Sequence, residues 1–192
     1  MTAQPHPSFV TVEDYLGGEE HADVKHEYLG GVVYAMAGGT NDHAAISANA
    51  ITALGTRLRG KLCRVFSSDA KVRIELTDHT RFYYPDAQVV CSGTAGTERF
   101  QERPTIVVEV LSESTRRTDL GEKRDAYLAI PSLKALIFVE SDRLTAIVYR
   151  RRAEGGFTVE EYAERQGVIN LPEIEAALPL SELYEGVDLP EN

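Results

Sequence analysis

Two carboxylates and one lysine are the residues of this chain best suited to chemistry. Glu109 stands within residues 106–111, the most apolar run of the sequence, and this composition is typical of a strand covered on both faces. An unpaired carboxylate buried there would be costly, so Glu109 needs a compensating partner, unless it faces water from an edge strand. Asp86 follows Pro85 at the expected start of another strand, although Pro-Asp is also a common turn element.

Lys123 lies in a helix that we expect to start near Thr118, with Asp119 and Glu122 spaced as a capping box, and to stop by Pro131. Lys123, Tyr127 and two aliphatic residues recur at helical spacing, which places the lysine on the inward face of that helix. Such a lysine either extends along the apolar surface to water or pairs with buried carboxylates.

Together these three residues could hydrolyse a phosphodiester bond. Carboxylate oxygens bind Mg²⁺ or Mn²⁺, the ion polarises the phosphate and acidifies a bound water, and a lysine orients that water or offsets developing charge. Asp86, Glu109 and Lys123 are separated by 23 and 14 residues. Only the fold can therefore bring them together.

The elements that must position these residues follow a mixed order of helices and strands. They are a helix at 11–16, a hairpin at 27–36, a helix at 43–59, strands at 64–67, 70–76, 83–90 and 105–111, a helix from 118, a hairpin at 134–150, a strand at 157–162 and a closing helix at 178–183. This order predicts an α/β (α+β) fold: a central mixed β-sheet flanked by helices, with an N-terminal β-hairpin extension.

Length and charge bound the organisation of the chain. Its 192 residues predict a single domain over 1–192. The net charge is −10, but residues 153–192 hold ten acids and one base, which marks an acidic C-terminal extension, whereas residues 31–152 carry 18 bases and 14 acids. A basic run in this middle part could track phosphates or be an ordinary solvated surface. Its candidate nucleic-acid contacts are Arg57, Arg59, Lys61 and Arg64.

Two cysteines, Cys63 and Cys91, are too few for a disulfide framework and lie in no zinc-binding pattern. A reducing cytoplasm is the simplest setting. The first residues lack the pattern of a signal peptide, and no apolar run is long enough to span a bilayer. We therefore expect a cytoplasmic protein with no membrane partner.

At the candidate residues the chain resembles the bacterial Uma-two family, a group of restriction-endonuclease-like proteins in the PD-(D/E)XK nuclease superfamily. The resemblance spans roughly residues 10 to 150, which would form the nuclease core. Its motifs are Glu27-Tyr28-x-x-Gly31, His43, Pro85-Asp86, Pro104-x-Ile106-Val107-Val108-Glu109-Val110-Leu111-Ser112-x-Ser114-Thr115, Asp119, Lys123 and Tyr127.

The resemblance implies a restriction-endonuclease-like core of helix, three-stranded antiparallel meander, helix and crossover strand. It also implies that Asp86 and Glu109 bind the metal, with the Val110 carbonyl as a further ligand. The superfamily's usual lysine, two residues after the second acid, is replaced here by Leu111, and Lys123 stands in for it. Glu27 and His43 are further candidates for the catalytic site, although each could instead make local structural contacts.

These observations predict a metal-dependent endonuclease acting on DNA. A protein that keeps the nuclease fold for binding or regulation without turnover is the main alternative, because a fold does not determine activity. An RNA-cleaving enzyme is a third reading. A homodimer is expected by analogy, since cutting both strands of a duplex calls for two sites.

Overall fold

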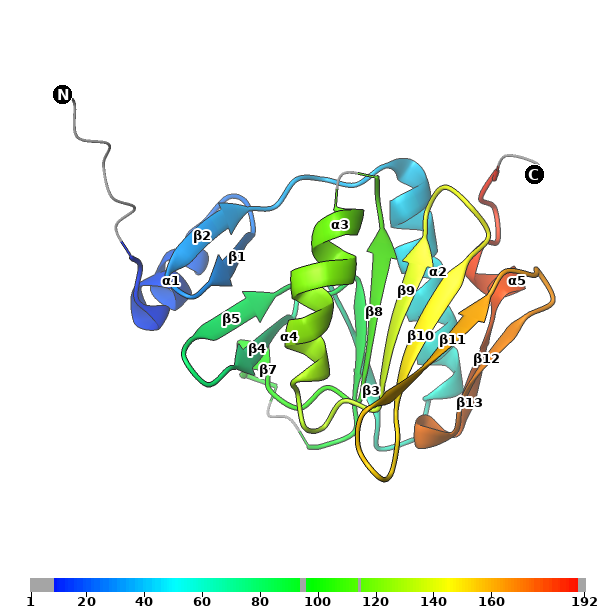
Figure 1. Cartoon of the computed structure of the whole chain (residues 1–192). Helices are drawn as coiled ribbons and strands as arrows, with labels where there is room; N and C mark the ends of the chain where they lie inside the picture. Colours follow the sequence, from blue (N-terminus) through cyan, green and yellow to red (C-terminus); the bar gives the residue numbers. More distant parts are fainter. Residues whose placement is uncertain (1–8, 94–95, 114, 190–192) are drawn as a thin grey trace.

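The computed structural model describes residues 9–93, 96–113 and 115–189 (Figure 1). Ser114 of the sequence motif lies outside these ranges. Two sheets dominate the structure. The larger has six strands in the order β11-β10-β9-β8-β6-β3. Their bounds are β3 Arg64–Ser67, β6 Ala87–Val90, β8 Ile106–Leu111, β9 Ala135–Glu140, β10 Ala146–Arg151 and β11 Phe157–Tyr162.

The six-stranded sheet contains the core that the family resemblance implies. β3, β6 and β8 are antiparallel neighbours, and β9 lies parallel to β8. The helical segment between β8 and β9 makes the crossover. It consists of α3 (Arg116–Thr118), a π-helical turn η1 (Asp119–Lys123) and α4 (Arg124–Leu128). The predicted α/β fold with a central mixed sheet is thus confirmed.

The second sheet has five strands in the order β2-β1-β5-β4-β7. Its strands are β1 His26–Leu29, β2 Val32–Ala35, β4 Lys71–Glu75, β5 Thr80–Tyr83 and β7 Phe100–Gln101. β1 and β2 form the predicted N-terminal hairpin, and Gly30 and Gly31 make its turn with φ of 57° and 102°, a region that favours glycine. α1 (Val12–Glu19) packs against this sheet through Tyr15, which contacts Tyr28 and Phe82.

The predicted strand over residues 83–90 is wrong. The chain leaves β5 at Tyr83 and enters β6 at Ala87, and these two strands belong to different sheets. Pro85 lies in the connection and has no N–H to donate to a strand ladder. Asp86 therefore precedes β6 rather than sharing a strand face with Tyr84, and its side chain sits where the two sheets meet.

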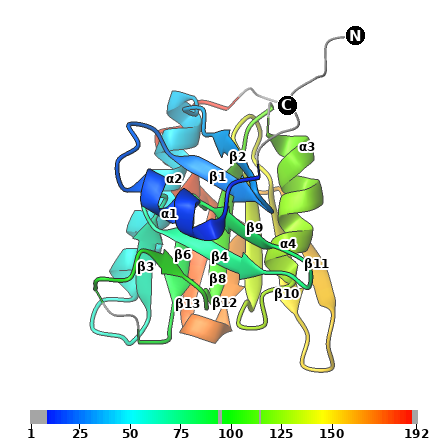
Figure 2. The same ribbon diagram turned by 90° about the vertical axis from the view of Figure 1, so that its left-hand side faces the viewer.

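Helices cover both faces of the six-stranded sheet (Figures 1 and 2). α2 (Asn41–Arg57) packs on one face through Ile46, Ala50 and Leu54. The crossover segment packs on the other face, where Tyr127 and Ile130 belong to a second buried cluster. The helix at 43–59 and the inward face of the crossover helix were both expected from apolar spacing.

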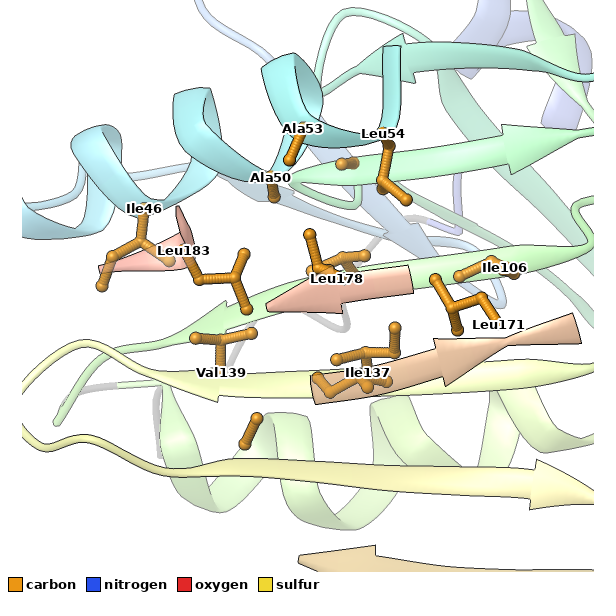
Figure 3. Packing of buried hydrophobic residues seen from close by; sticks show 14 of the residues in the cluster. Ile46, Ala50, Ala53, Leu54, Ile106, Ile137, Val139, Leu171, Leu178 and Leu183 are labelled. Atoms are coloured by element: carbon orange, nitrogen blue, oxygen red, sulfur yellow. The ribbon is translucent and has the colours of Figure 1, made fainter. Parts of the chain in front are cut away.

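The acidic C-terminal region also belongs to the core. β13 (Ala176–Pro179) and α5 (Leu180–Leu183) pack against α2, and β12 (Val168–Leu171) pairs with β13, with η2 (Pro172–Ile174) between them. Leu183 is buried beside Ile46 and Val139, in the same cluster as Leu178 (Figure 3). The closing helix is shorter than the predicted 178–183, because Leu178 pairs with Ile169 in a β-ladder.

Cys63 and Cys91 are joined by a disulfide. They flank the antiparallel pair of β3 and β6, in which Arg64 lies opposite Val90. The sequence did not anticipate this bond, because two cysteines 28 residues apart show no pairing until strand register brings them together. In the part of the chain described, no helix has both the length and the apolar character needed for a membrane crossing.

Leu183→Ala should lower the free energy of unfolding by about 2–5 kcal/mol, because it leaves a cavity in the core between α5 and α2. Chemical denaturation monitored by circular dichroism would measure this loss. Val159→Ala is the control, since Val159 is 61% exposed on β11 and should change stability by less than about 0.5 kcal/mol. Equal stability of the Leu183 variant and the wild type would show that the C-terminal region is not part of the cooperative core.

Candidate active site

The candidate residues line one cleft of about 330 Å³. Its walls are the β1–β2 hairpin, the N-terminal end of α2, the connection before β6, the end of β8 and the π-helical turn. The cleft brings together the following predicted site residues: Glu27, His43, Asp86, Glu109, Val110 and Lys123. Residues up to 96 positions apart in sequence thus meet in a single site, as the proposed chemistry requires.

Asp86 is fixed by hydrogen bonds to both carboxylate oxygens. The backbone N–H of Val110 donates to Oδ2 at 2.8 Å, and the Ser47 hydroxyl shares its one proton between the His43 carbonyl at 2.8 Å and Oδ1 at 3.1 Å. The first bond ties the β5–β6 connection to β8, and the second ties it to α2. Asp86 is therefore held in one orientation beside Glu109.

Glu109 is buried in the middle of the apolar strand β8. The Tyr127 hydroxyl donates a hydrogen bond to its Oε1 at 2.7 Å, and Lys123 Nζ lies 3.3 Å from the same oxygen. Tyr127 and Lys123 are four residues apart on the crossover helix, so one helix face supplies both partners. Lys123 therefore supplies the positive charge that compensates for the burial of Glu109.

Lys123 is the centre of the charge cluster. Its side chain is 10% exposed, and its ammonium lies 2.9 Å from Glu27 Oε1 and 3.6 Å from Asp119 Oδ1, in addition to Glu109. It also lies over the Tyr83 ring, 5.2 Å from the ring centroid. Lys123 is therefore paired with buried carboxylates and does not extend to water.

The crossover helix has an irregular turn at this point. In η1 the N–H of Arg124 donates to the carbonyl of Asp119, five residues back, rather than four. Such π turns are frequent at functional sites. The expected capping role of Asp119 is wrong, because the helix begins at Arg116 and the Asp119 side chain is buried toward Lys123. Glu122, its predicted capping partner, pairs with Arg81 at the surface.

His43 lies in the first turn of α2, with Nε2 3.4 Å from Asp86 Oδ2. The ring packs against Gly39, where a Cβ atom would come within 2.8 Å of it. Glycine at this position therefore lets the imidazole approach Asp86. The hydrogen bond to Asp86 raises the pKa of His43 above its ordinary value, and burial opposes that effect.

The pKa values of the cluster reflect too many acids around one base. Burial, above all, raises the pKa of Glu109 to about 8; Asp86 and Asp119 add to the rise, while Lys123 opposes it. Burial works to lower the pKa of Lys123, but Glu109, Glu27 and Asp119 outweigh it and raise that pKa. The lysine thus stays charged, and Glu109 binds a proton near neutral pH unless another cation replaces it.

The donor set suits a hard divalent cation. Among the described residues, no group of three or more His, Cys, Asp or Glu side chains is arranged to hold a metal ion. The ligands that we predict for the metal are only two side chains, the carboxylates of Asp86 and Glu109, and one backbone group, the Val110 carbonyl. Mg²⁺ commonly takes only one or two protein carboxylates and keeps several waters. The oxygen donors and the surplus negative charge therefore fit Mg²⁺ or Mn²⁺.

The basic run lies away from this cleft. Arg57 is fourteen residues beyond His43 in α2, about 20 Å along the helix axis. It makes two hydrogen bonds to Glu182, and Lys61 contacts Glu175, so both are bound to the acidic C-terminal region. Arg59 and Arg64 are exposed. A role of these four residues in binding nucleic acid stays a prediction.

Sequence reasoning missed two contributors to the site. Asp119 belongs to the family motif, but its spacing to Glu122 suggested a helix cap. Its spacing of four residues from Lys123, which predicts an ion pair on one helix face, was the better signal. Ser47 could have been found in the same way, since it lies one helical turn after His43 on α2. Tyr127, which the spacing placed on the inward face of the helix, fixes Glu109 through its hydroxyl.

The sheet, its crossover helix and the acid pair at the start of β6 and within β8 define a protein of the restriction-endonuclease-like class. A crystal structure described as a putative nuclease belonging to DUF820, from Anabaena variabilis, matches the fold with a TM-score of 0.72 and 18% identity, covering 91% of this chain and 97% of the other.

The sequence comparisons show the family. The model of the Uma2 family, described as "Putative restriction endonuclease", matches residues 12–181, and the chain belongs to this family. The protein slr1290 of Synechocystis is 32% identical over 91% of each chain, and sll1609 of the same organism is 27% identical over 68% of this chain and 75% of its own. The family resemblance expected from the motifs is confirmed.

The raised pKa of Glu109 predicts a pH-dependent stability in metal-free buffer. The folded protein binds the Glu109 proton more tightly than the unfolded chain does. The stabilisation of the folded state by this proton is therefore complete below about pH 4.5 and is lost as the pH rises through about 8. Glu109→Gln should therefore flatten the decline in melting temperature between these values. Exposed Glu154→Gln is the control. Parallel melting curves for the Glu109 variant and the wild type across this range would contradict the assignment.

Proposed function

We propose that this protein is a metal-dependent endonuclease that hydrolyses phosphodiester bonds of DNA. The observation that carries the proposal is the convergence of Asp86, Glu109 and Lys123 in one cleft. Membership of a restriction-endonuclease family and the likeness to a nuclease fold support a nucleic-acid substrate. DNA is the substrate to test first, and RNA is the comparison.

The two carboxylates and the Val110 carbonyl would hold the metal. When bound, Mg²⁺ or Mn²⁺ polarises the phosphate and lowers the pKa of a coordinated water. The Val110 N–H and the Ser47 hydroxyl keep Asp86 in place, and Tyr127 keeps Glu109 in place. Prior orientation of the carboxylates avoids reorganisation during the reaction.

Lys123 supplies the fixed positive charge of the site. Its ammonium is held between Glu27 and Glu109, where it can orient the attacking water or stabilise negative charge that develops on the phosphate. Glu27 and His43 act as positioning residues in this proposal, since they contact Lys123 and Asp86 respectively. The hydrogen bond to Asp86 raises the pKa of His43, which favours its protonated form beside the cleft.

The remaining expectations depend on the substrate. The proposed homodimer is needed only if both strands of a duplex are cut, because each strand then calls for its own site. We keep a cytoplasmic location as a proposal that suits a cellular DNA substrate, although the Cys63–Cys91 disulfide removes the argument from free cysteines for a reducing setting. Binding without turnover, the main alternative, is an outcome that the following experiments distinguish.

Wild-type protein should nick plasmid DNA in the presence of Mg²⁺ or Mn²⁺, and Asp86→Ala should abolish cleavage. Millimolar Mn²⁺ should also raise the melting temperature of the wild type, because the ion binds only the folded site, and this rise should disappear in the variant. Asp78→Ala is the control, since Asp78 is an exposed acid outside the cleft. A rise in melting temperature without cleavage of DNA or RNA would support the binding alternative.

Lys123→Met should reduce the rate of cleavage by roughly 10²-fold or more, because it removes one well-aimed charge while keeping most of the side-chain volume. Lys123→Arg should recover little of the lost cleavage rate, since a planar guanidinium does not fit the place of a compact ammonium. Single-turnover cleavage would give the rate, and the Mn²⁺-induced rise in melting temperature would show that the metal still binds. Cleavage by Lys123→Met at the wild-type rate would remove the lysine from the mechanism.

A further inference from the structure

Tyr34 is an exposed aromatic residue in the wall of the cleft. It is 53% exposed and is one of the cleft's lining residues. Within the described part of the chain, its side chain has no hydrogen bond, ion pair or ring contact, and it belongs to none of the hydrophobic clusters. Packing of the fold therefore does not account for an aromatic ring here.

Strand register places Tyr34 beside the charge cluster. In the β1–β2 hairpin Tyr34 lies directly opposite Glu27, so both side chains project from the same face, with Cβ atoms about 5 Å apart. Glu27 reaches from that face to Lys123 at 2.9 Å. The Tyr34 ring thus stands immediately next to the residues that would act on a phosphate. The exposed face of the ring is therefore open to a ligand that enters the cleft.

The cleft has few charges that could attract a nucleic-acid backbone. Four carboxylates line it, whereas its described lining holds one lysine, whose ammonium is already paired with three of them, and one histidine. Phosphate contacts from lysine and arginine usually supply most of the affinity for nucleic acids. Apart from the proposed metal ion, which contacts one phosphate, this cleft needs another source of affinity for the strand it binds.

We propose that Tyr34 is a stacking platform for an unpaired base of the substrate strand, next to the phosphate that is cut. This subsite rests on the proposed nuclease function. A base inside a duplex has both faces covered by its neighbours, so only a single-stranded or extruded base can stack on the ring. Stacking tolerates any base and needs no positive charge, which suits an acidic cleft.

The subsite narrows the substrate class. A strand that is unpaired at the cleft is cut by one site, and such a reaction needs no second copy of the chain. The proposed substrate is therefore single-stranded DNA or the unpaired part of a larger DNA, such as a loop, a flap, a displaced strand or the locally opened segment of a supercoiled plasmid.

Binding of fluorescently labelled oligonucleotides tests the subsite without requiring cleavage. The probes are a twelve-nucleotide oligothymidylate and a strand of equal length and charge made of abasic nucleotides, with Ca²⁺ in place of Mg²⁺. Wild-type protein should bind oligothymidylate roughly tenfold more tightly than the abasic strand. Tyr34→Ala should lose this preference by weakening only oligothymidylate binding, and Tyr34→Phe should keep it, because the ring and not the hydroxyl does the stacking.

Phe9→Ala is the matched control, since Phe9 is an aromatic residue 76% exposed that does not line the cleft, and it should leave the preference unchanged. Equal binding of the two strands by the wild type, no binding of either, or an unchanged preference in Tyr34→Ala would overturn the subsite. Tighter binding of a blunt duplex than of oligothymidylate would also overturn it. Loss of cleavage in Asp86→Ala is independent of these results, so a failure of the subsite is distinguishable from a failure of the nuclease proposal.

Discussion

One buried ammonium holds the site together. Lys123 of the crossover helix contacts Glu27 of β1, Glu109 of β8 and Asp119 of its own turn, so three separate parts of the fold meet at a single charge. Removing the lysine would leave buried carboxylates without a partner, which costs more than the loss of a surface ion pair. One positive charge against three negative ones also leaves the cluster short of cations. Burial above all, together with the neighbouring acids, raises the pKa of Glu109, and a metal ion would relieve the charge imbalance.

The parts of the fold that follow local rules could be predicted from the sequence. The apolar run around Glu109 indicated a central strand, and helical spacing placed Lys123 and Tyr127 on an inward face. The hairpin at Gly30 and Gly31 followed from turn chemistry. Glu109 was identified because its place in an apolar strand and the family motif pointed to the same residue, whereas Asp86 was identified mainly by the motif.

Features set by tertiary contacts could not be predicted. Pro85 is a local signal of a break between β5 and β6, but the assignment of these two strands to different sheets depends on their partners. The disulfide depends on the register of β3 and β6. The partners of Arg57 and Lys61 come from residues more than 100 positions later, so a local excess of positive charge gave no indication that acids would neutralise it. At these two residues, the positive charge of the middle of the chain pairs with the acidic C-terminal region and helps to hold that region in place.

The π-helical turn loosens the link between chain length and side-chain direction in the segment between β8 and α4. Each residue of an α-helix advances the side-chain direction by about 100°, whereas a π turn accommodates one extra residue within a single turn, so the residues after it keep the phase of the residues before it. In η1 this extra residue lies between Asp119 and Arg124. Loss of one residue from the turn, such as Gly121, which does not line the cleft, would therefore convert it into a regular α turn while Lys123 and Tyr127 stayed directed at Glu109. The crossover helix can thus change in length by one residue without moving the charge at the centre of the site.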